Sequence, residues 1–367
     1  MINVLHIMGS ADVGGISAVV LNYYRHMDRE RFHFDLVLHT PTPGRDGRIF
    51  QSMGSTVYYL PQKHTDFKGF SDGLKKILSE KHYDAIHVHH NDTSYVALRI
   101  AKQMGIPCRI AHSHSTIPVS CMKDELRRLS GCVLNPIYAT QVIGCGQLAG
   151  ERVFGKLNMK RSFAHVLPNA IDTQRFAFSS EYRGEVRKEL GIGSKPAIGI
   201  VGRLSEQKNP LFALKVLNAV LEKIPDACLV YVGGGEMESE IREEIHRLGL
   251  KDKVILTGSR SDVERIYSAP DVMIMPSLYE GFPVAAVEAM ASGLPIVLSD
   301  HITKEFSFGT AVRYLPIDDP VLWARAVEEL MQLPGREQRQ SEAREHGFDI
   351  HDTASMLESI YLKDISQ

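Results

Sequence analysis

The sequence predicts an α/β protein built from two parallel-sheet domains. Short apolar runs of strand length alternate with helix-length segments along the whole chain, which is the pattern of parallel α/β folds. The alternation restarts after a break near residue 168. A chain of 367 residues also exceeds what one hydrophobic core usually accommodates. We therefore expect two Rossmann-like units, each with its ligand site beyond the carboxyl ends of the strands, and a cleft between them.

The individual elements follow from the same apolar runs. Helical segments such as 15–26, 69–80 and 94–104 separate the strands expected in the first half. These strands are 4–8, 34–38, 56–60, 85–89, 109–112, 141–145 and 165–167. In the second half we expect strands at 196–202, 228–232, 254–257, 272–275 and 296–298.

Composition is that of an ordinary globular protein, with 44% hydrophobic and 23% charged residues. No apolar run approaches the ~20 residues that span a bilayer, and the N-terminus lacks the basic start and cleavage site of a signal peptide. Five cysteines without a CxxC pair indicate neither a disulfide framework nor a zinc site. We expect a cytoplasmic, reduced protein.

Charge is distributed unevenly between the halves. Residues 1–168 hold 20 Lys and Arg against 13 Asp and Glu, whereas residues 169–367 hold 22 against 31. A basic first half could favour an anionic acceptor such as a lipid-linked diphosphate, or peripheral contact with the inner face of a membrane. Ordinary solvated surfaces with no such preference explain the asymmetry equally well.

The most informative segment is 276–293, PSLYEGFPVAAVEAMASG, which follows an apolar strand. Pro283 is well suited to the first turn of a helix, because its φ is fixed and its missing N–H costs nothing there. Free N–H groups of Phe282, Val284 and Ala285 would then face a ligand above the strand, a geometry suited to a diphosphate. The carboxylates of Glu280 and Glu288 could hold sugar hydroxyls on either side.

Two further segments supply groups that suit a phosphate. Arg203 and Lys208 follow the first strand of the second half, where two cations could grip a pyrophosphate and stabilise its charge as it leaves. Gly14 and Gly15 follow the first strand of the chain, and glycines there let the backbone approach a ligand closely.

These motifs resemble those of retaining glycosyltransferases of family 4, which have the two-domain GT-B architecture. The resemblance covers essentially the whole chain and is greatest for the branch that assembles exopolysaccharide and capsule. The segment 167–172, LPNAID, resembles the family's hinge, with Ala170 where glycine is usual. The resemblance implies an acceptor-side domain at 1–168, a sugar-nucleotide domain at 169–345, and a last helix within 346–367 that crosses back toward the first domain.

The family pattern also assigns roles to single residues. It implies that the loop with Gly14 and Gly15 closes over the donor diphosphate, and that Gly233 lies in a turn beside the nucleotide. Arg260 could contact the base. Helix capping explains the segments that contain Gly233 and Arg260 nearly as well. His114 matches a histidine that contacts the transferred sugar, with His112 as the alternative because both share one face of a strand.

The resemblance implies transfer of a hexose from a sugar nucleotide, with a UDP-sugar as the expected donor, to a glycan or lipid-linked acceptor. Glu280 would hold the sugar 3- and 4-hydroxyls with Gly281 beside it, and Glu288 the ribose. Arg203 and Lys208 would balance the leaving charge, so we expect no metal and no cofactor. Glu305 lies in a segment that departs from the family pattern and is not assigned.

Other functions remain open at this point. A sugar-nucleotide 2-epimerase or hydrolase on the same fold would convert its donor without an acceptor. A non-catalytic sugar-nucleotide-binding assembly partner would have degraded motifs, whereas all four charged residues are present. A dinucleotide oxidoreductase is disfavoured because neither half has G-x-G-x-x-G followed by an acidic residue. The sequence does not settle the donor base and sugar, the acceptor, the linkage or the oligomeric state.

Overall fold

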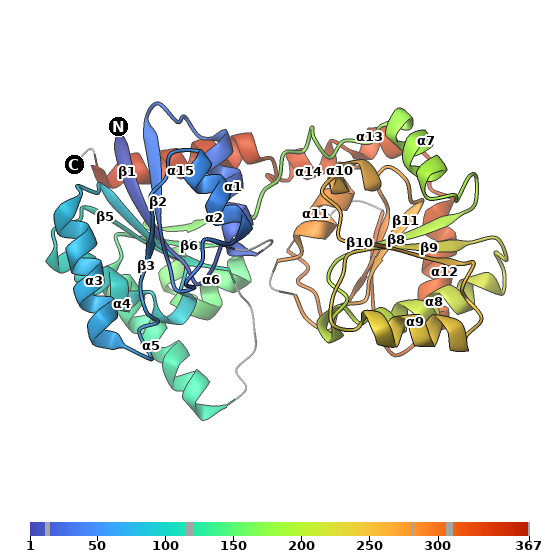
Figure 1. The fold of residues 1–367 in the computed structure, drawn as a ribbon, viewed down its shortest axis with the longest axis horizontal. Coiled ribbons are helices and arrows are strands. Elements are labelled where there is room, and N and C mark those ends of the chain that lie inside the picture. The colour runs from blue at the N-terminus through green and yellow to red at the C-terminus, as the bar shows by residue number, and fades with distance from the viewer. Residues whose placement is uncertain (12–14, 115–120, 281, 306–310, 366–367) are drawn as a thin grey trace. The chain divides into compact units, whose positions relative to one another are not determined.

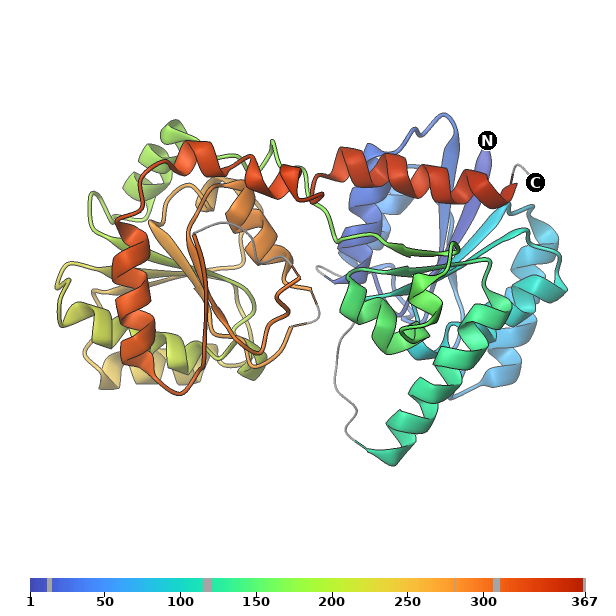
Figure 2. The same cartoon turned by 180° about the vertical axis from the view of Figure 1, so that it is seen from behind.

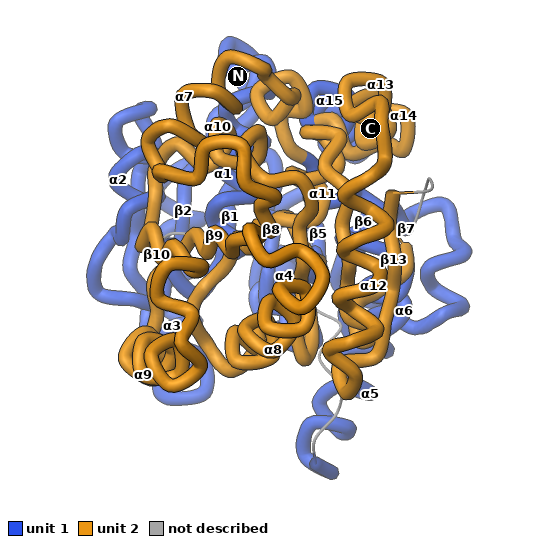
Figure 3. The backbone as a smooth tube through the Cα atoms, turned by 90° about the vertical axis from the view of Figure 1, so that its right-hand side faces the viewer, with its two compact units in different colours: residues 1–170, 350–367 blue, residues 171–349 orange. Residues whose placement is uncertain are grey.

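A computed structural model of the chain describes residues 1–11, 15–114, 121–280, 282–305 and 311–365. The chain divides into two compact units (Figure 3). Unit 1 comprises Met1–Ala170 and Ile350–Gln367, and unit 2 comprises Ile171–Asp349. Each unit has one parallel sheet covered by helices on both faces (Figure 1). The predicted fold class, with two Rossmann-like units, is therefore confirmed.

The sheet of unit 1 has seven strands in the order β3-β2-β1-β4-β5-β6-β7, and every neighbouring pair is parallel. All seven were predicted from apolar runs, with ends that differ by one or two residues. The strands are β1 (Ile2–Ile7), β2 (Phe32–Leu38), β3 (Val57–Tyr59), β4 (Ala85–Val88), β5 (Cys108–Ser113), β6 (Gln141–Gly144) and β7 (Ala164–Val166).

Two apolar layers cover this sheet. Helices α1 (Ile16–His26), α2 (Gly44–Ser52) and α15 (Ile350–Ile365) pack on one face, where Phe34, Phe50 and Leu357 are buried. Helices α3 (Phe67–Glu80), α4 (Tyr95–Gln103) and α6 (Gln147–Phe154) pack on the other, around Phe70. The C-terminal helix α15 thus belongs to the core of unit 1, although about 180 residues separate it from the rest (Figure 2).

Unit 1 also contains α5 (Met122–Tyr138), which contacts α4 and α6 and extends beyond the other helices (Figure 1). Short 3-10 turns occur at Asn91–Thr93 and Asn158–Lys160. Among the helices that the structure describes, none combines the length and the apolar character needed to cross a membrane.

The sheet of unit 2 has six strands in the order β10-β9-β8-β11-β12-β13, again parallel throughout. This is the Rossmann strand order 3-2-1-4-5-6. Five of the strands were predicted, and the sixth, β13, was missed. The strands are β8 (Ala197–Val201), β9 (Cys228–Val232), β10 (Val254–Gly258), β11 (Val272–Met275), β12 (Ile296–Ser299) and β13 (Val312–Leu315).

Helices cover both faces of this sheet as well. One face carries α8 (Pro210–Leu221), α9 (Glu238–Arg247) and α12 (Pro320–Met331), packed around Trp323. The remaining elements of unit 2 are α7 (Ser180–Glu189), η3 (Glu206–Lys208), α10 (Val263–Ile266), α11 (Val284–Ala291), α13 (Arg336–Arg339) and α14 (Glu342–Glu345).

Strand order locates the expected ligand site in each unit. Successive strands are added to one side of β1 and then, from β4 on, to its other side; in unit 2 the same switch occurs between β8 and β11. Ligands of open α/β sheets bind beyond the carboxyl ends of the strands at such a switch point. In unit 1 these ends lead to His89, and in unit 2 they lead to Arg203 and Ser277.

Candidate active site

The loops after β8 and β11 meet at the switch point of unit 2. The Lys208 ammonium donates a hydrogen bond to Glu280 Oε1, and the two side chains are only 20% and 8% exposed. The backbone N–H of Leu278 donates to the carbonyl of Gln207 at 2.8 Å, and Gln207 Nε2 donates to the Tyr279 carbonyl at 3.0 Å. The structure thus brings together Lys208 and Glu280, which lie 72 positions apart in the sequence.

Arg203 lies in the same loop but differs in its environment. Its side chain is exposed, and within the described ranges no hydrogen bond or ion pair to its guanidinium is found. Its backbone is held in place, because Tyr231 Oη donates to the Arg203 carbonyl at 3.1 Å. Arg203 therefore presents a cation on a fixed backbone, in the same loop as Lys208.

The turn at Gly233 packs directly against this loop. Gly233 has φ +143°, and a Cβ at that position would lie 1.9 Å from the carbonyl oxygen of Gly202. The N–H of Leu204 donates to the Gly234 carbonyl at 3.0 Å. Close backbone approach therefore requires glycine at 233, and the turn supports the loop that carries Arg203.

The start of α11 differs in two details from the prediction. Pro283 is the N-cap residue rather than a first-turn residue, since the helix begins at Val284. The Val284 N–H is not free, because it donates to the Phe282 carbonyl at 3.0 Å in a tight turn. The predicted donor set at this helix start was therefore wrong for Val284. Gly14 and Gly281 lie outside the described residues.

Glu288 lies on the second turn of α11 and is half-buried. Tyr267 Oη donates to Glu288 Oε2 at 2.6 Å. Burial raises the pKa of Glu288, and the hydrogen bond from Tyr267 opposes that rise. Sequence reasoning missed Tyr267, because it comes from a separate helix turn 21 positions upstream.

Two other predicted residues have clear local roles. Arg260 forms ion pairs with Glu189 at 2.6 Å and Asp262 at 2.8 Å, so any contact with a base would compete with two carboxylates. Gly15 is the N-cap of α1 with φ +69° and ψ −144°, a conformation that favours glycine.

In unit 1, His112 and His114 lie on one face of β5, as predicted. They belong to a larger cluster that also includes His6, His87 and His89, all on the same face of three adjacent strands. His114 is partly exposed at the carboxyl end of β5, whereas His112 is 2% exposed. Because His114 is the accessible member of the pair, it suits contact with a ligand better than His112 does.

Sequence reasoning did not predict that these histidines form one cluster. His87 and His89 alternate along β4, a pattern that could have placed both on one face. His6 is a lone histidine in β1, and nothing near it in the sequence indicates a partner. Two overlapping triplets, His6–His87–His89 and His89–His112–His114, have ring nitrogens within 4.8 Å of one another and are the candidate metal ligands in unit 1.

A basic cavity of about 520 Å³ opens at the carboxyl end of β4. Lys63 Nζ lies 3.1 Å from His90 Nδ1 within it. Burial, together with the charge of Arg127, lowers the pKa of Lys63 to about 8. The cavity is lined by Lys63, His64, His90, Asn91, Asp92, Thr93, Lys123 and Arg127. Its excess of cations suits an anionic ligand.

Comparisons with known proteins identify the family of this chain. The family model described as Glycosyltransferase Family 4 matches residues 13–175, and the model described as Glycosyl transferases group 1 matches residues 183–346. The chain is 32% identical to a "Putative glycosyltransferase EpsF" of Bacillus subtilis, over 98% of this chain and 96% of that protein.

A second relative has a more specific description. The chain is 26% identical to the "UDP-Gal:alpha-D-GlcNAc-diphosphoundecaprenol alpha-1,3-galactosyltransferase" of Escherichia coli, over 82% of this chain and 79% of that protein. Among solved structures, Anabaena Alr3699/HepE in complex with UDP superposes with a TM-score of 0.82 at 18% identity, covering 98% of this chain and 99% of that one. HepE was also solved with UDP-glucose, and at this identity the likeness establishes the fold.

Proposed function

The chain belongs to the glycosyltransferases of group 1 and family 4, and on that premise we propose that it transfers a hexose from a UDP-sugar to a lipid-linked glycan. The product would be a precursor of exopolysaccharide or another cell-surface polymer. The galactosyltransferase relative supports both the UDP-sugar and the diphospholipid acceptor, because its description names both. The similarity to EpsF over nearly the whole chain supports transferase activity.

The observation that supports the donor assignment is the ion pair of Lys208 with Glu280, which joins the loops after β8 and β11, together with Arg203 in the first of these loops. Arg203 and Lys208 would hold the donor diphosphate and stabilise the charge that develops on it. Glu280, already next to Lys208, would accept hydrogen bonds from the sugar 3- and 4-hydroxyls. Glu288, held by Tyr267, would accept from the ribose hydroxyls.

Transfer would proceed with retention and without a metal ion. The bond from the anomeric carbon to the donor phosphate oxygen breaks, and the acceptor oxygen bonds to that carbon on the same face. The acceptor proton passes to an oxygen of the departing diphosphate, so no protein base is required. His114 would orient the sugar as positive charge develops at the anomeric carbon.

The acceptor assignment rests on unit 1. The basic cavity lined by Lys63, Lys123 and Arg127 suits the diphosphate of a lipid-linked acceptor. Next to it, α5 carries an exposed apolar stripe at helical spacing, in which each side chain is between 47% and 77% exposed. This stripe consists of Met122, Leu126, Leu129, Val133 and Ile137. We assign it to peripheral contact with a membrane, since the cavity at its start attracts anionic lipid.

Donor binding and transfer test the first assignment. We expect UDP-sugars to raise the melting temperature more than GDP- or ADP-sugars. Substitution Arg203→Ala or Lys208→Ala should lower turnover by about 10²-fold, the scale of losing one preorganised donor. Arg242→Ala, which removes an exposed cation from α9 in the same unit, is the matched control. Full activity of Arg203→Ala or of Lys208→Ala, or conversion of the donor without an acceptor, would contradict the proposal.

Acceptor recognition needs a separate measurement. Lys63→Ala and Arg127→Ala should raise the KM for a diphospholipid-linked acceptor at least tenfold and leave the KM for the donor unchanged. Lys75→Ala on the exposed face of α3 is the control. Replacing Leu126 and Val133 with Ser should release the protein from vesicles of anionic lipid, whereas Leu157→Ser, also exposed, should not. If the variant with both substitutions still sediments with the vesicles, the stripe does not bind the membrane.

A further inference from the structure

Five histidines and one tyrosine of unit 1 form a single unbranched chain of hydrogen bonds. From one end, His114 Nε2 lies 2.8 Å from His89 Nδ1, and His89 Nε2 lies 3.0 Å from His6 Nδ1. His6 Nε2 then meets the hydroxyl of Tyr361 at 3.5 Å. That hydroxyl lies 2.7 Å from His87 Nδ1, and His87 Nε2 lies 3.1 Å from His112 Nδ1.

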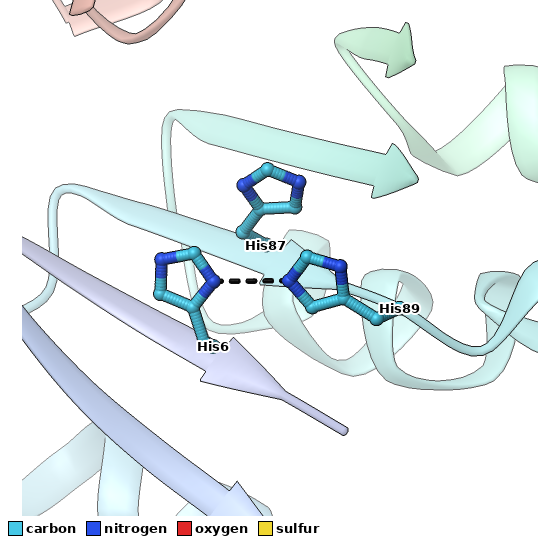
Figure 4. A group of neighbouring side chains, drawn as sticks. All are labelled: His6, His87 and His89. Atoms are coloured by element: carbon cyan, nitrogen blue, oxygen red, sulfur yellow. Dashed lines mark hydrogen bonds between the residues drawn. The ribbon is translucent and has the colours of Figure 1, made fainter. Parts of the chain in front are cut away.

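The rings meet in two ways, and only one of them is a hydrogen bond. Bonded pairs meet edge to edge, with ring centroids 5.1 to 5.3 Å apart, and His6 and His89 are nearly coplanar at 11° (Figure 4). Pairs that share a strand stack face to face instead. The centroids of His87 and His89 lie 4.5 Å apart, and those of His112 and His114 lie 4.0 Å apart.

This geometry separates a hydrogen-bonded chain from a metal site. A metal ion needs ring nitrogens whose lone pairs converge on one point at ~2.0–2.1 Å. Here the nitrogens of coplanar rings face each other at hydrogen-bond distance, so the space between them holds one proton. The triplets that could gather around an ion would have to turn their rings and break these bonds.

Each N···N contact needs one bare nitrogen as acceptor, so two bonded rings cannot both be charged, and burial favours the neutral form of every ring. Burial lowers the pKa of His6 to about 3 and that of His114 to about 4, and it holds the pKa of His87, His89 and His112 well below the usual value. A neutral imidazole has one N–H and one bare nitrogen, and a tyrosine hydroxyl likewise both donates and accepts. Every bond in the chain can therefore form only if all protons point the same way.

Two collective arrangements satisfy this condition. Either all five histidines carry the proton on Nδ1, or all five carry it on Nε2. The ends of the chain distinguish them, because His114 Nδ1 and His112 Nε2 are both buried without a partner in the described structure. Asn169 Oδ1 is also buried without a partner, and a hydrogen bond with the Asn169 side chain raises the pKa of His114, the effect that an acceptor has on an imidazole N–H. The Nδ1–H form of His114 can donate to Asn169 Oδ1, whereas the Nε2–H form leaves both atoms unpaired.

We propose that all five histidines carry their proton on Nδ1, and that Tyr361, His6 and His89 are positioning residues that fix the tautomer and orientation of His114. The hydrogen-bonded chain connects Tyr361 of α15 to His114 at the carboxyl end of β5. Its role in catalysis rests on the proposed function, in which His114 orients the sugar. The tautomer assignment stands independently of it.

Histidine side-chain nitrogen chemical shifts test the assignment directly in the full chain. At pH 7 we expect five neutral histidines that share the Nδ1–H tautomer, identified by single substitutions. A mixture of tautomers among the five, or the Nε2–H form throughout, would overturn the proposal. Addition of Zn²⁺ should leave these resonances unchanged, and stoichiometric binding that shifts all five would establish a metal site instead.

Substitution Tyr361→Phe removes the hydroxyl through which His6 and His87 are hydrogen-bonded in the chain, while keeping the aromatic ring. We expect the resonances of His114 to shift to those of a tautomer mixture, with kcat lowered about tenfold and the donor KM little changed. Tyr83→Phe is the matched control, since it removes a buried hydroxyl bonded to Asp35 on the opposite face of the sheet. If Tyr361→Phe leaves the His114 tautomer unchanged, the chain does not set it. If the tautomer changes but kcat does not, the role of His114 in the proposed function fails while the chain stands.

Discussion

The two units share a sheet topology but treat polar groups at the switch point in opposite ways. Unit 1 holds five neutral histidines in a hydrogen-bonded chain, four of them buried and His114 partly exposed, whereas the three histidines of unit 2, His246, His301 and His346, are all exposed. Unit 2 instead buries charge, in the pair of Lys208 and Glu280. The difference shows that one fold can hold functional side chains either by hydrogen bonds between neutral groups or by an ion pair. The two kinds of interaction respond differently to acid and to substitution.

Acid should destabilise unit 1 at a higher pH than unit 2, and this is the largest effect we expect. The folded-state pKa of each buried histidine lies below its unfolded value of about 6.5, so the resulting stability is complete above pH 6.5 and is lost as pH falls toward 4. Each histidine contributes a slope of about 1.4 kcal/mol per pH unit, and five give up to about 7. One pH unit could therefore remove most of the stability of a typical domain.

Trp323 reports on the folding of unit 2 alone, so the acid stabilities of the two units can be compared. It is the only tryptophan of the chain and is buried in unit 2. Between pH 6 and 4.5 we expect hydrogen exchange, corrected for intrinsic rates, to rise in unit 1 while Trp323 fluorescence stays native. Loss of both signals at the same pH would mean that the histidine cluster does not set the acid stability of unit 1.

Breaking the buried ion pair should give the next largest effect. Lys208→Ala leaves the Glu280 carboxylate in its buried place without the ammonium, which typically costs 3–5 kcal/mol. Urea denaturation followed by Trp323 fluorescence measures this loss in unit 2. The double variant Lys208→Met, Glu280→Gln should recover most of the stability, because it removes both charges. Recovery of stability without recovery of turnover would separate the structural role of the pair from its role at the donor.

Tyr267→Phe should have a smaller effect with a distinct pH dependence. The Tyr267 hydroxyl lowers the pKa of Glu288 against burial, so its loss destabilises the charged carboxylate. We expect unit 2 to lose about 2 kcal/mol at pH 7, the worth of a hydrogen bond to a charged group. The loss should be smaller at pH 4.5 than at pH 7, because the pKa of Glu288 in the folded protein is raised above 4.5 and the carboxyl is then mostly protonated. Tyr279→Phe, at a side chain 49% exposed, is the control, and an equal loss at both pH values would contradict the assignment.

Much of the fold was predictable because parallel strands are buried on both faces and appear as apolar runs. The strands at 228–232 and 272–275 have the predicted ends. β13 was missed because it is half-buried and includes Arg313, so it has no continuous apolar run. The start of β2 was placed two residues late, since His33 interrupts its apolar pattern.

The site was predictable where it depends on strand ends and was not predictable where it depends on pairing across the sheet. Lys208 and Glu280 converge because each follows a strand of the same parallel sheet. His6 joins His89 only through the pairing of β1 with β4, and Tyr361 arrives from a helix 355 positions away from His6. Local pattern contains no information on such contacts. The hydrogen bond that occupies the Val284 N–H likewise depends on the exact turn that precedes α11.

Arg260→Ala should have the smallest effect on stability and gives the finest test of the donor site. Its ion pairs with Glu189 and Asp262 lie at the surface, where such pairs are worth about 0–1 kcal/mol and are screened by salt. If Arg260 also contacts the nucleotide base, its loss should raise the donor KM severalfold and leave kcat unchanged, since such a contact is equal in ground and transition states. Arg265→Ala, which breaks ion pairs with Glu185 and Asp262, is the matched control. Equal kinetics in the two variants would assign Arg260 to the local ion pairs alone and would leave base recognition to other residues of unit 2.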